Sequence, residues 1–362
     1  MSEMETPWRR DPADVEPLLD AWAKQRVDPT ATVSDVVPPG GNGMSSETVL
    51  FTLVVDDQPA VHHAARLAPL PSLYPVFPEY DLATQARCME VVAANTDVPV
   101  PTVHWLEEDA SWLGVPFLVM NRIEGTPPSD MPPYVFDGWL VRASQDERDA
   151  FEANSISVVA RLHRLTPATH DLAFLDRPRH GSTPLEQHLN AQRWYYDWAR
   201  EDQHHPLIER TFAWLDTHRP PEGAPVLNWG DARIGNILYE GAEPVAVLDW
   251  EMAAVGPPEI DLAWMIFMHR FFQDMAERYG MPGVPGFMDR ARAARTYEEM
   301  SGRRVEALEW YEVFAALRFA IVSVRTSTRA IAYRTMEEPA DLDDLVMFRA
   351  LLEDMLSGVY WS

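Results

Sequence analysis

Residues 226–264 read VLNWGDARIGNILYEGAEPVAVLDWEMAAVGPPEIDLAW, and this stretch decides the fold that we predict for the chain. Two short apolar runs separated by turn residues predict a β-hairpin over 237–248. Asp231 and Asn236 stand five residues apart just before the hairpin, and Asp249 directly follows it. The stretch therefore gathers three side chains with oxygen atoms around one small hairpin.

The spacing predicts that Asn236 and Asp249 face each other at the open end of the hairpin, because the midpoint between them falls inside its turn. Cross-strand partners lie about 5 Å apart. Mg²⁺ prefers oxygen ligands and is commonly held by one or two protein groups together with substrate phosphates. We therefore interpret Asn236 and Asp249 as metal ligands, and Asp231 as the base or positioning group for an attacking hydroxyl. This arrangement is typical of phosphoryl transfer, although Asp and Asn are also common at ordinary surface turns.

The stretch resembles the catalytic region of the aminoglycoside phosphotransferase family, which shares the protein-kinase-like fold. The segments that carry the resemblance are Gly230-Asp231, Asn236, Asp249-Trp250-Glu251 and Asp261-Leu262-Ala263-Trp264. The resemblance implies a two-lobed α+β fold. Residues 1–122 would form a small, β-rich nucleotide-binding lobe with an N-terminal helix, and residues 123–362 a larger, mainly helical lobe with the catalytic loop and a substrate cleft.

The implied activity is transfer of the γ-phosphoryl group of ATP or GTP to a hydroxyl of a small molecule, with Mg²⁺ as the cofactor. Arg233 lies next to the reaction centre and is a further candidate catalytic residue that contacts phosphate. Asp261 is expected to brace the catalytic loop by accepting backbone N–H bonds, as the family's matching Asp does, although simple stabilisation of its helix N-terminus is an alternative. Trp229 stands where the family usually has His, and because an indole donates but cannot accept, any bond made through a His acceptor is lost or replaced.

The first lobe is expected to bind the nucleotide. A glycine-rich segment at 40–43 precedes a predicted strand at 48–55, and such a loop lets backbone N–H groups approach phosphates, although a plain hairpin turn is also compatible. No Gly-Lys-Ser/Thr follows, which excludes a P-loop. The resemblance implies nucleotide contacts from the loop, from a basic residue on the next strand and from the hinge. These residues are Gly43, Ser45, Ser46, Arg66, Met120, Asn121 and Arg122.

In protein kinases the basic residue is paired by a Glu on the following helix. Here Gln85 stands near the expected position and Glu90 lies further along the helix. The ion pair of protein kinases is therefore not expected in the same form.

The remaining helices follow from apolar periodicity. Residues 12–26 predict an amphipathic helix, residues 147–165 predict another on which His163 is structural, and residues 185–219 predict two helices divided near Pro206. An aromatic and acidic stretch at 194–202 suits either a cleft for a cationic ring or an aromatic core with a solvated acidic face.

Composition bounds the function. The 362 residues suggest about two domains, and the net charge of −26 would repel nucleic acid and attract a cationic acceptor, although it also favours solubility. The single Cys88 excludes an internal disulfide and favours a reducing compartment. No apolar run of about 18 residues or export signal is present, so we expect a cytoplasmic protein without membrane contact.

Three alternatives remain open from the sequence. The acceptor hydroxyl could belong to a hydroxyacyl thioester or another metabolite instead of an aminoglycoside. The chain could be a nucleotide-binding module without catalysis. The same oxygen ligands would also serve a metal-dependent phosphoester hydrolase.

Overall fold

The computed structural model describes residues 9–39 and 45–361, which form two compact units. The first comprises Met1–Glu90 with Pro101–Glu124, and the second comprises Val91–Val100 with Gly125–Ser362. The division therefore lies two residues beyond the predicted boundary, and residues 91–100, which we predicted in the first lobe, belong to the second unit. One reason is a backbone bond within the second unit, in which the Val247 N–H donates to the Pro99 carbonyl at 2.8 Å.

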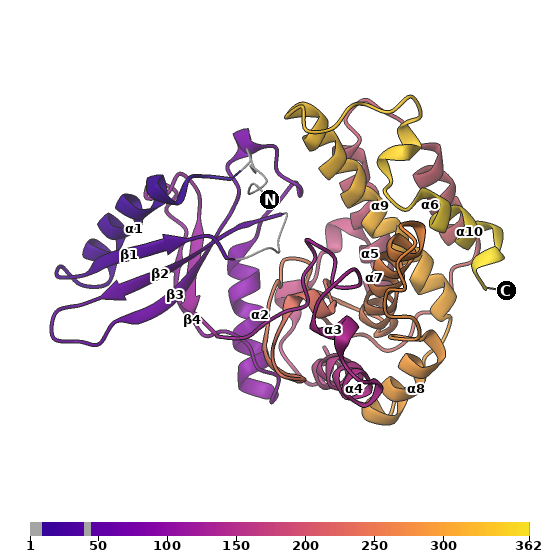
Figure 1. Cartoon of the computed structure of the whole chain (residues 1–362), viewed down its shortest axis with the longest axis horizontal. Helices are drawn as coiled ribbons and strands as arrows, with labels where there is room; N and C mark the ends of the chain where they lie inside the picture. Colours follow the sequence, from indigo (N-terminus) through magenta and orange to yellow (C-terminus); the bar gives the residue numbers. More distant parts are fainter. Residues whose placement is uncertain (1–8, 40–44, 362) are drawn as a thin grey trace. The chain divides into compact units, whose positions relative to one another are not determined.

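The first unit is built on a five-stranded antiparallel sheet with the strand order β1-β2-β3-β5-β4 (Figure 1). The predicted strand at 48–55 is confirmed as β2, shifted by one residue. The strands are β1 (Thr32–Val37), β2 (Glu47–Val54), β3 (Val61–Leu67), β4 (Val103–Glu107) and β5 (Phe117–Asn121).

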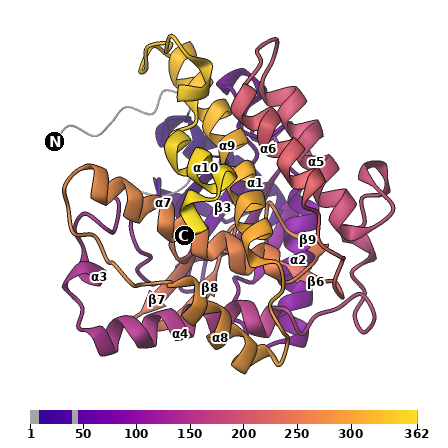
Figure 2. The same cartoon turned by 90° about the vertical axis from the view of Figure 1, so that its right-hand side faces the viewer.

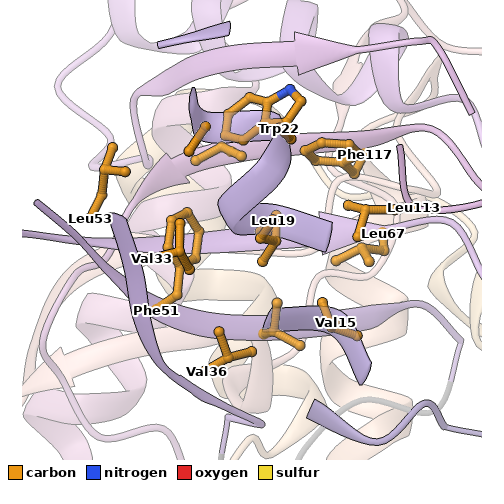
Figure 3. Close-up of a cluster of buried hydrophobic side chains, with 14 of the residues drawn as sticks. Val15, Leu19, Trp22, Val33, Val36, Phe51, Leu53, Leu67, Leu113 and Phe117 are labelled. Carbon is orange, nitrogen blue, oxygen red and sulfur yellow. The ribbon is translucent and has the colours of Figure 1, made fainter. Parts of the chain in front are cut away.

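The N-terminal helix α1 (Pro12–Arg26) has the predicted bounds and packs on this sheet. The Asp11 side chain accepts the Ala13 N–H at 2.9 Å and so caps the helix start. Leu19 and Trp22 are buried against the strands, and Trp22 meets Phe117 edge-on with ring centroids 5.2 Å apart (Figure 3). This apolar layer makes the first unit a β-rich body with its own core.

The second unit is mainly helical and carries two small two-stranded sheets. One pairs β6 (Val226–Asn228) with β9 (Ala254–Gly256), and the other is the predicted hairpin of β7 (Ile237–Glu240) and β8 (Glu243–Val247). The long helix α9 packs against α5, α6, α7 and α10 (Figure 2). The helices of this unit are α3 (Trp139–Arg142), α4 (Gln145–Leu162), α5 (Pro184–Ala199), α6 (Pro206–Thr217), α7 (Glu259–Arg278), α8 (Arg290–Ser301), α9 (Leu308–Ala332) and α10 (Arg349–Ser357). Helix α2 (Leu82–Asn95) contributes residues to both units.

The helix predictions hold, including the division before Pro206 at the start of α6. The aromatic stretch on α5 is occupied by the chain's own cations. The Arg179 guanidinium lies 5.1 Å from the Trp194 ring centroid, and the Arg325 guanidinium lies 4.1 Å from that of Trp198. The Trp198 ring therefore packs on a buried cation of the chain itself, whereas the Arg179–Trp194 pair lies at the surface, with Trp194 38% exposed. In the part of the chain that the structure describes, none of the helices combines the length and apolarity needed to cross a bilayer.

Candidate active site

The loop between β6 and β7 brings Asp231 and Asn236 together. The Asn236 amide nitrogen donates to Oδ2 of Asp231 at 2.6 Å. On the other oxygen, Oδ1 of Asp231 accepts the Trp264 indole N–H at 2.7 Å. Bonds to both oxygens fix the plane of the carboxylate, as a group that must orient a hydroxyl requires.

Asp261 braces this loop, as predicted. It is fully buried on the first turn of α7, where its Oδ2 accepts the Trp229 backbone N–H at 2.7 Å and its Oδ1 accepts the Gly230 N–H at 2.8 Å. His163 adds a third bond, from Nε2 to Oδ2 at 3.1 Å, and its Nδ1 is bonded to the Tyr297 hydroxyl at 2.8 Å. His163 is therefore structural, as expected, and it reaches the catalytic loop through Asp261.

Gly230 is required by the path of the loop. Its φ is 93°, in the region that favours glycine, and a Cβ there would overlap the Met252 carbonyl oxygen. Its own carbonyl accepts a 2.7 Å bond from Nη2 of Arg318, which comes from α9. The backbone just before Asp231 is thus held on both its N–H and its carbonyl sides.

Trp229 shows what replaces the family's usual His. Its ring is fully buried, and the indole N–H donates to the Leu248 carbonyl at 2.8 Å and to the Asp249 carbonyl at 3.1 Å. The indole donates to the residues that follow β8, so it links the catalytic loop to the segment that carries Asp249.

The hairpin register corrects one prediction. The Asn236 carbonyl accepts the Leu248 N–H at 2.9 Å, so Asn236 faces Leu248 and not Asp249. The cause is the position of the turn, which lies at residues 241–242, one residue before the predicted midpoint, since Glu240 pairs with Glu243. A bulge between Leu238 and Tyr239 offsets only part of this difference and leaves Asn236 opposite Leu248. Asp249 follows with a φ of 61°, where the chain turns away from the strand.

Both predicted metal ligands have the chemistry that Mg²⁺ needs. Because the Asn236 nitrogen donates to Asp231, the amide oxygen is the atom left for a cation, and Asp249 adds a partly exposed carboxylate. Within residues 9–39 and 45–361, no group of three or more His, Cys, Asp and Glu side chains is placed to hold a metal. The pair fits an ion that takes most of its ligands from water and phosphate oxygens, which is the habit of Mg²⁺.

Arg233 lies between two carboxylates. Its Nη1 is 2.6 Å from Oδ2 of Asp130, and its Nε is 3.4 Å from Oδ2 of Asp231. Burial lowers the pKa of Arg233, but the charges of Asp130 and Asp231 more than offset this and raise its pKa above the ordinary value. Asp130 was not among the predicted site residues. It lies in the Pro-rich segment 125–133, near the start of the predicted second lobe.

A small cavity adjoins this ion pair. Its volume is about 10 Å³, enough for one water molecule, and its wall is mostly apolar and rich in methionine. The lining residues are Asp130, Tyr134, Arg233, Ile234, Gly235, Met265, Met268, His269, Phe272 and Met288.

The predicted nucleotide residues lie in the first unit, apart from Gly43, which is outside the described residues. Ser45 and Ser46 directly precede β2, and Arg66 is 8% exposed on β3, between Thr48 and Leu118 of the neighbouring strands. Their contact with a nucleotide stays a prediction.

Helix α2 carries Gln85 and Glu90, the two residues near the position of the kinase-type Glu. Gln85 is 2% exposed, and its amide nitrogen has no hydrogen-bond partner among the described residues. Glu90 forms a surface pair with Arg87 at 3.1 Å.

The hinge candidates Met120, Asn121 and Arg122 end β5. The Asn121 N–H donates to the Thr102 carbonyl and the Arg122 N–H donates to the His62 carbonyl, both at 3.1 Å. These two N–H groups already have partners within the unit, so a purine would have to use other backbone groups near this strand end.

Comparison with known proteins places this geometry in context. The model of the phosphotransferase enzyme family matches residues 64–303. A crystal structure from Ralstonia eutropha, provisionally assigned as an aminoglycoside phosphotransferase, shares 22% identity with a TM-score of 0.64 and covers 95% of this chain and 98% of its own. A thermostable aminoglycoside phosphotransferase in a ternary complex with ADP and hygromycin B shares 15% identity with a TM-score of 0.57, over 95% of this chain and 98% of its own. At these identities the likeness establishes the two-lobed α+β fold.

Two curated relatives of this chain are named as acyl-CoA dehydrogenases. Acyl-CoA dehydrogenase family member 10 of Mus musculus is 31% identical over 198 residues, which are 54% of this chain and 17% of the mouse protein. The probable acyl-CoA dehydrogenase IBR3 of Arabidopsis thaliana is 23% identical over 65% of this chain and 30% of its own length. The matches thus span less than a third of these longer relatives.

Proposed function

We propose that this chain, which belongs to the phosphotransferase enzyme family, transfers the γ-phosphoryl group of ATP or GTP to a hydroxyl group of a small molecule. The observation that carries the proposal is the Asp231 carboxylate, whose two oxygens are held by Trp264 and Asn236 at 2.7 and 2.6 Å. A carboxylate fixed in this way can orient an acceptor hydroxyl and take its proton as the new phosphate ester forms.

Asn236 and Asp249 would hold Mg²⁺, which when bound neutralises charge on the transferred phosphates. In the same proposal, Arg66 contacts the α- and β-phosphates, Ser45 and Ser46 donate to phosphate oxygens, and the Met120–Arg122 strand end lies beside the base. The neighbouring structure with bound ADP supports a nucleotide co-substrate. Arg233 is already paired with Asp130 and Asp231, so its phosphate contact would require a change of partner.

For the acceptor, we favour a hydroxyacyl thioester. The curated relatives carry the name acyl-CoA dehydrogenase, and the matched part covers 17% of the first and 30% of the second. The cavity beside Arg233 supports the same choice, because three of its ten lining residues are methionines and its carboxylate, Asp130, is paired with Arg233. Methionine side chains adapt readily, so an acyl chain larger than the present 10 Å³ would enter by displacing them.

An aminoglycoside is the second candidate, favoured by the net charge of −26 and by the named substrate of the hygromycin complex. The two classes differ in charge and polarity. Transfer from labelled ATP to a panel of 3- and 4-hydroxyacyl thioesters, tested beside a panel of amino sugars, separates them directly.

The test of nucleotide and metal binding is a thermal-shift titration with ATP and GTP, each with and without Mg²⁺. At a hundredfold excess over the dissociation constant, binding adds about 2.7 kcal/mol, or roughly 3–5 °C for a chain of 362 residues. The Mg²⁺-dependent part of the shift should disappear in Asp249→Ala and persist in Glu240→Ala, an exposed carboxylate at the far end of the same hairpin.

The outcomes separate the alternatives. A Mg²⁺-dependent shift without transfer to any acceptor would indicate a nucleotide-binding module. Phosphate release that never depends on an acceptor would indicate a hydrolase. The absence of a shift with either nucleotide, in folded protein, would contradict the proposed function.

A further inference from the structure

A buried cation lies directly behind the catalytic loop. Arg318 on α9 is 2% exposed, and its Nη2 donates to the Gly230 carbonyl at 2.7 Å. Its Nε and Nη1 have no hydrogen-bond partner among the described residues. Burying a charged group with unsatisfied N–H groups is costly, and such departures from good packing tend to occur at functional sites.

The face of Trp264 partly compensates this buried charge. The Arg318 guanidinium carbon lies 4.3 Å from the centroid of the Trp264 ring, a favourable cation–π distance. Burial lowers the pKa of Arg318 to about 10, while Asp261 and Asp231 oppose that shift, so the guanidinium remains charged at neutral pH. The indole ring is itself buried, at 3% exposure.

The edge of the same ring reaches the reaction centre, since the Trp264 N–H donates to Asp231 at 2.7 Å. A cation over the ring face draws electron density from the indole and strengthens its N–H as a donor, as polarised hydrogen-bond chains do in a low-dielectric interior. Arg318, Trp264 and Asp231 therefore form a continuous chain from α9 through α7 to the catalytic loop.

Trp264 also differs from the other side chains that contact this carboxylate. Asn236 is the proposed metal ligand, and Arg233 is the candidate phosphate contact, so both would take part in binding the nucleotide and its ion. Trp264 lies on a buried helix with its ring held between Arg318 and the loop. It can keep the carboxylate in place whether or not the nucleotide is bound.

We propose that Trp264 and Arg318 are positioning residues for phosphoryl transfer, which fix the orientation of the Asp231 carboxylate toward the acceptor hydroxyl. The inference rests on the proposed function. A purely structural role for Trp264 would affect stability and leave catalysis alone, and the experiment is designed on that difference.

The experiment measures hydrolysis of Mg·ATP and of Mg·GTP without an added acceptor, together with thermal unfolding, for Trp264→Phe and a matched control. The control is Trp310→Phe, because Trp310 is also 3% exposed and its indole N–H also makes one bond, to the Leu215 carbonyl at 3.0 Å. Loss of a hydrogen bond to a charged group should lower kcat roughly ten- to a hundredfold in Trp264→Phe. The KM for the nucleotide should stay within about twofold, and Trp310→Phe should keep the wild-type kcat.

A second comparison uses Asp231→Asn as the background. If Trp264 acts through Asp231, adding Trp264→Phe to Asp231→Asn should change kcat little further, since residues that act as a unit are not additive. Arg318→Gln should likewise lower kcat in the wild type and have much less effect in Trp264→Phe. If Trp264→Phe does not fold, benzothienylalanine at position 264 keeps the ring and removes only the N–H.

The outcomes are distinguishable. Wild-type protein that neither hydrolyses these nucleotides nor transfers phosphate to any member of the two acceptor panels would overturn the proposed function and this inference with it. Wild-type turnover with equal kcat values for Trp264→Phe and Trp310→Phe, or a full Trp264→Phe effect that persists in Asp231→Asn, would overturn the positioning role alone.

Discussion

The substitution Asp261→Asn probes the brace of the catalytic loop. The Asp261 oxygens accept the backbone N–H groups of Trp229 and Gly230 at 2.7 and 2.8 Å, from a fully buried position. Asparagine has nearly the same shape but only one acceptor oxygen, so one of these N–H groups would face an NH₂ donor. The substitution therefore removes one bond and the charge without creating a cavity.

The expected loss follows from those contacts. A hydrogen bond to a charged group contributes about 1.5–3 kcal/mol, and the remaining bond weakens when the acceptor becomes neutral. We expect a destabilisation of about 3 kcal/mol, which lowers Tm by roughly 6–12 °C for a unit of this size. Turnover should fall as well, because the same bonds hold the backbone just before Asp231.

Scanning calorimetry and turnover measured on the same preparation test this expectation. Asp343→Asn is the matched control, because Asp343 is also buried and accepts a backbone N–H, that of Leu207 at the start of α6. The control should lower Tm and leave kcat unchanged. An Asp261→Asn protein with the Tm and the kcat of the wild type would refute the bracing role.

Two further predictions concern backbone space and pH. Gly230→Ala should prevent folding or abolish turnover, since its Cβ would overlap Met252. Gly241→Ala, at a φ of 62° with open space around it, should lower the free energy of unfolding by only about 1 kcal/mol. Comparable denaturation midpoints for the two variants would contradict this prediction. Burial raises the pKa of Glu312 to about 7 despite the neighbouring Arg290, so the folded state favours the protonated carboxyl. The contribution of Glu312 to the free energy of unfolding is therefore complete below about pH 4.5 and is lost as pH rises to about 7. Wild-type Tm should therefore fall relative to Glu312→Gln over that range, and parallel Tm curves would argue against it.

The sequence predicted those parts of the site that are local in the chain. The apolar runs around one turn identified the hairpin, and the Asp231 to Asn236 spacing identified two residues that contact each other at 2.6 Å. The register was wrong by one residue because neither the exact place of the turn, at residues 241–242, nor the bulge that follows it can be read from alternation alone.

The contacts that hold the site from outside the loop were harder to predict. Arg318 is 88 residues from Gly230, and Asp130 is 103 residues from Arg233. Nothing in the local pattern of α9 or of the Pro-rich segment distinguishes these side chains from ordinary core and loop residues. Trp264 lay within the motif, but only the packing of α7 shows that its N–H reaches Asp231.

The most direct test of the account is turnover by Asp231→Asn, measured with the acceptor found in the transfer screen and beside a nucleotide thermal-shift titration. The account predicts that the variant binds Mg·ATP or Mg·GTP nearly as the wild type does, while kcat falls by a factor of at least about 10². Wild-type turnover in the variant would contradict the assignment of Asp231 and, with it, the proposed mechanism of phosphoryl transfer.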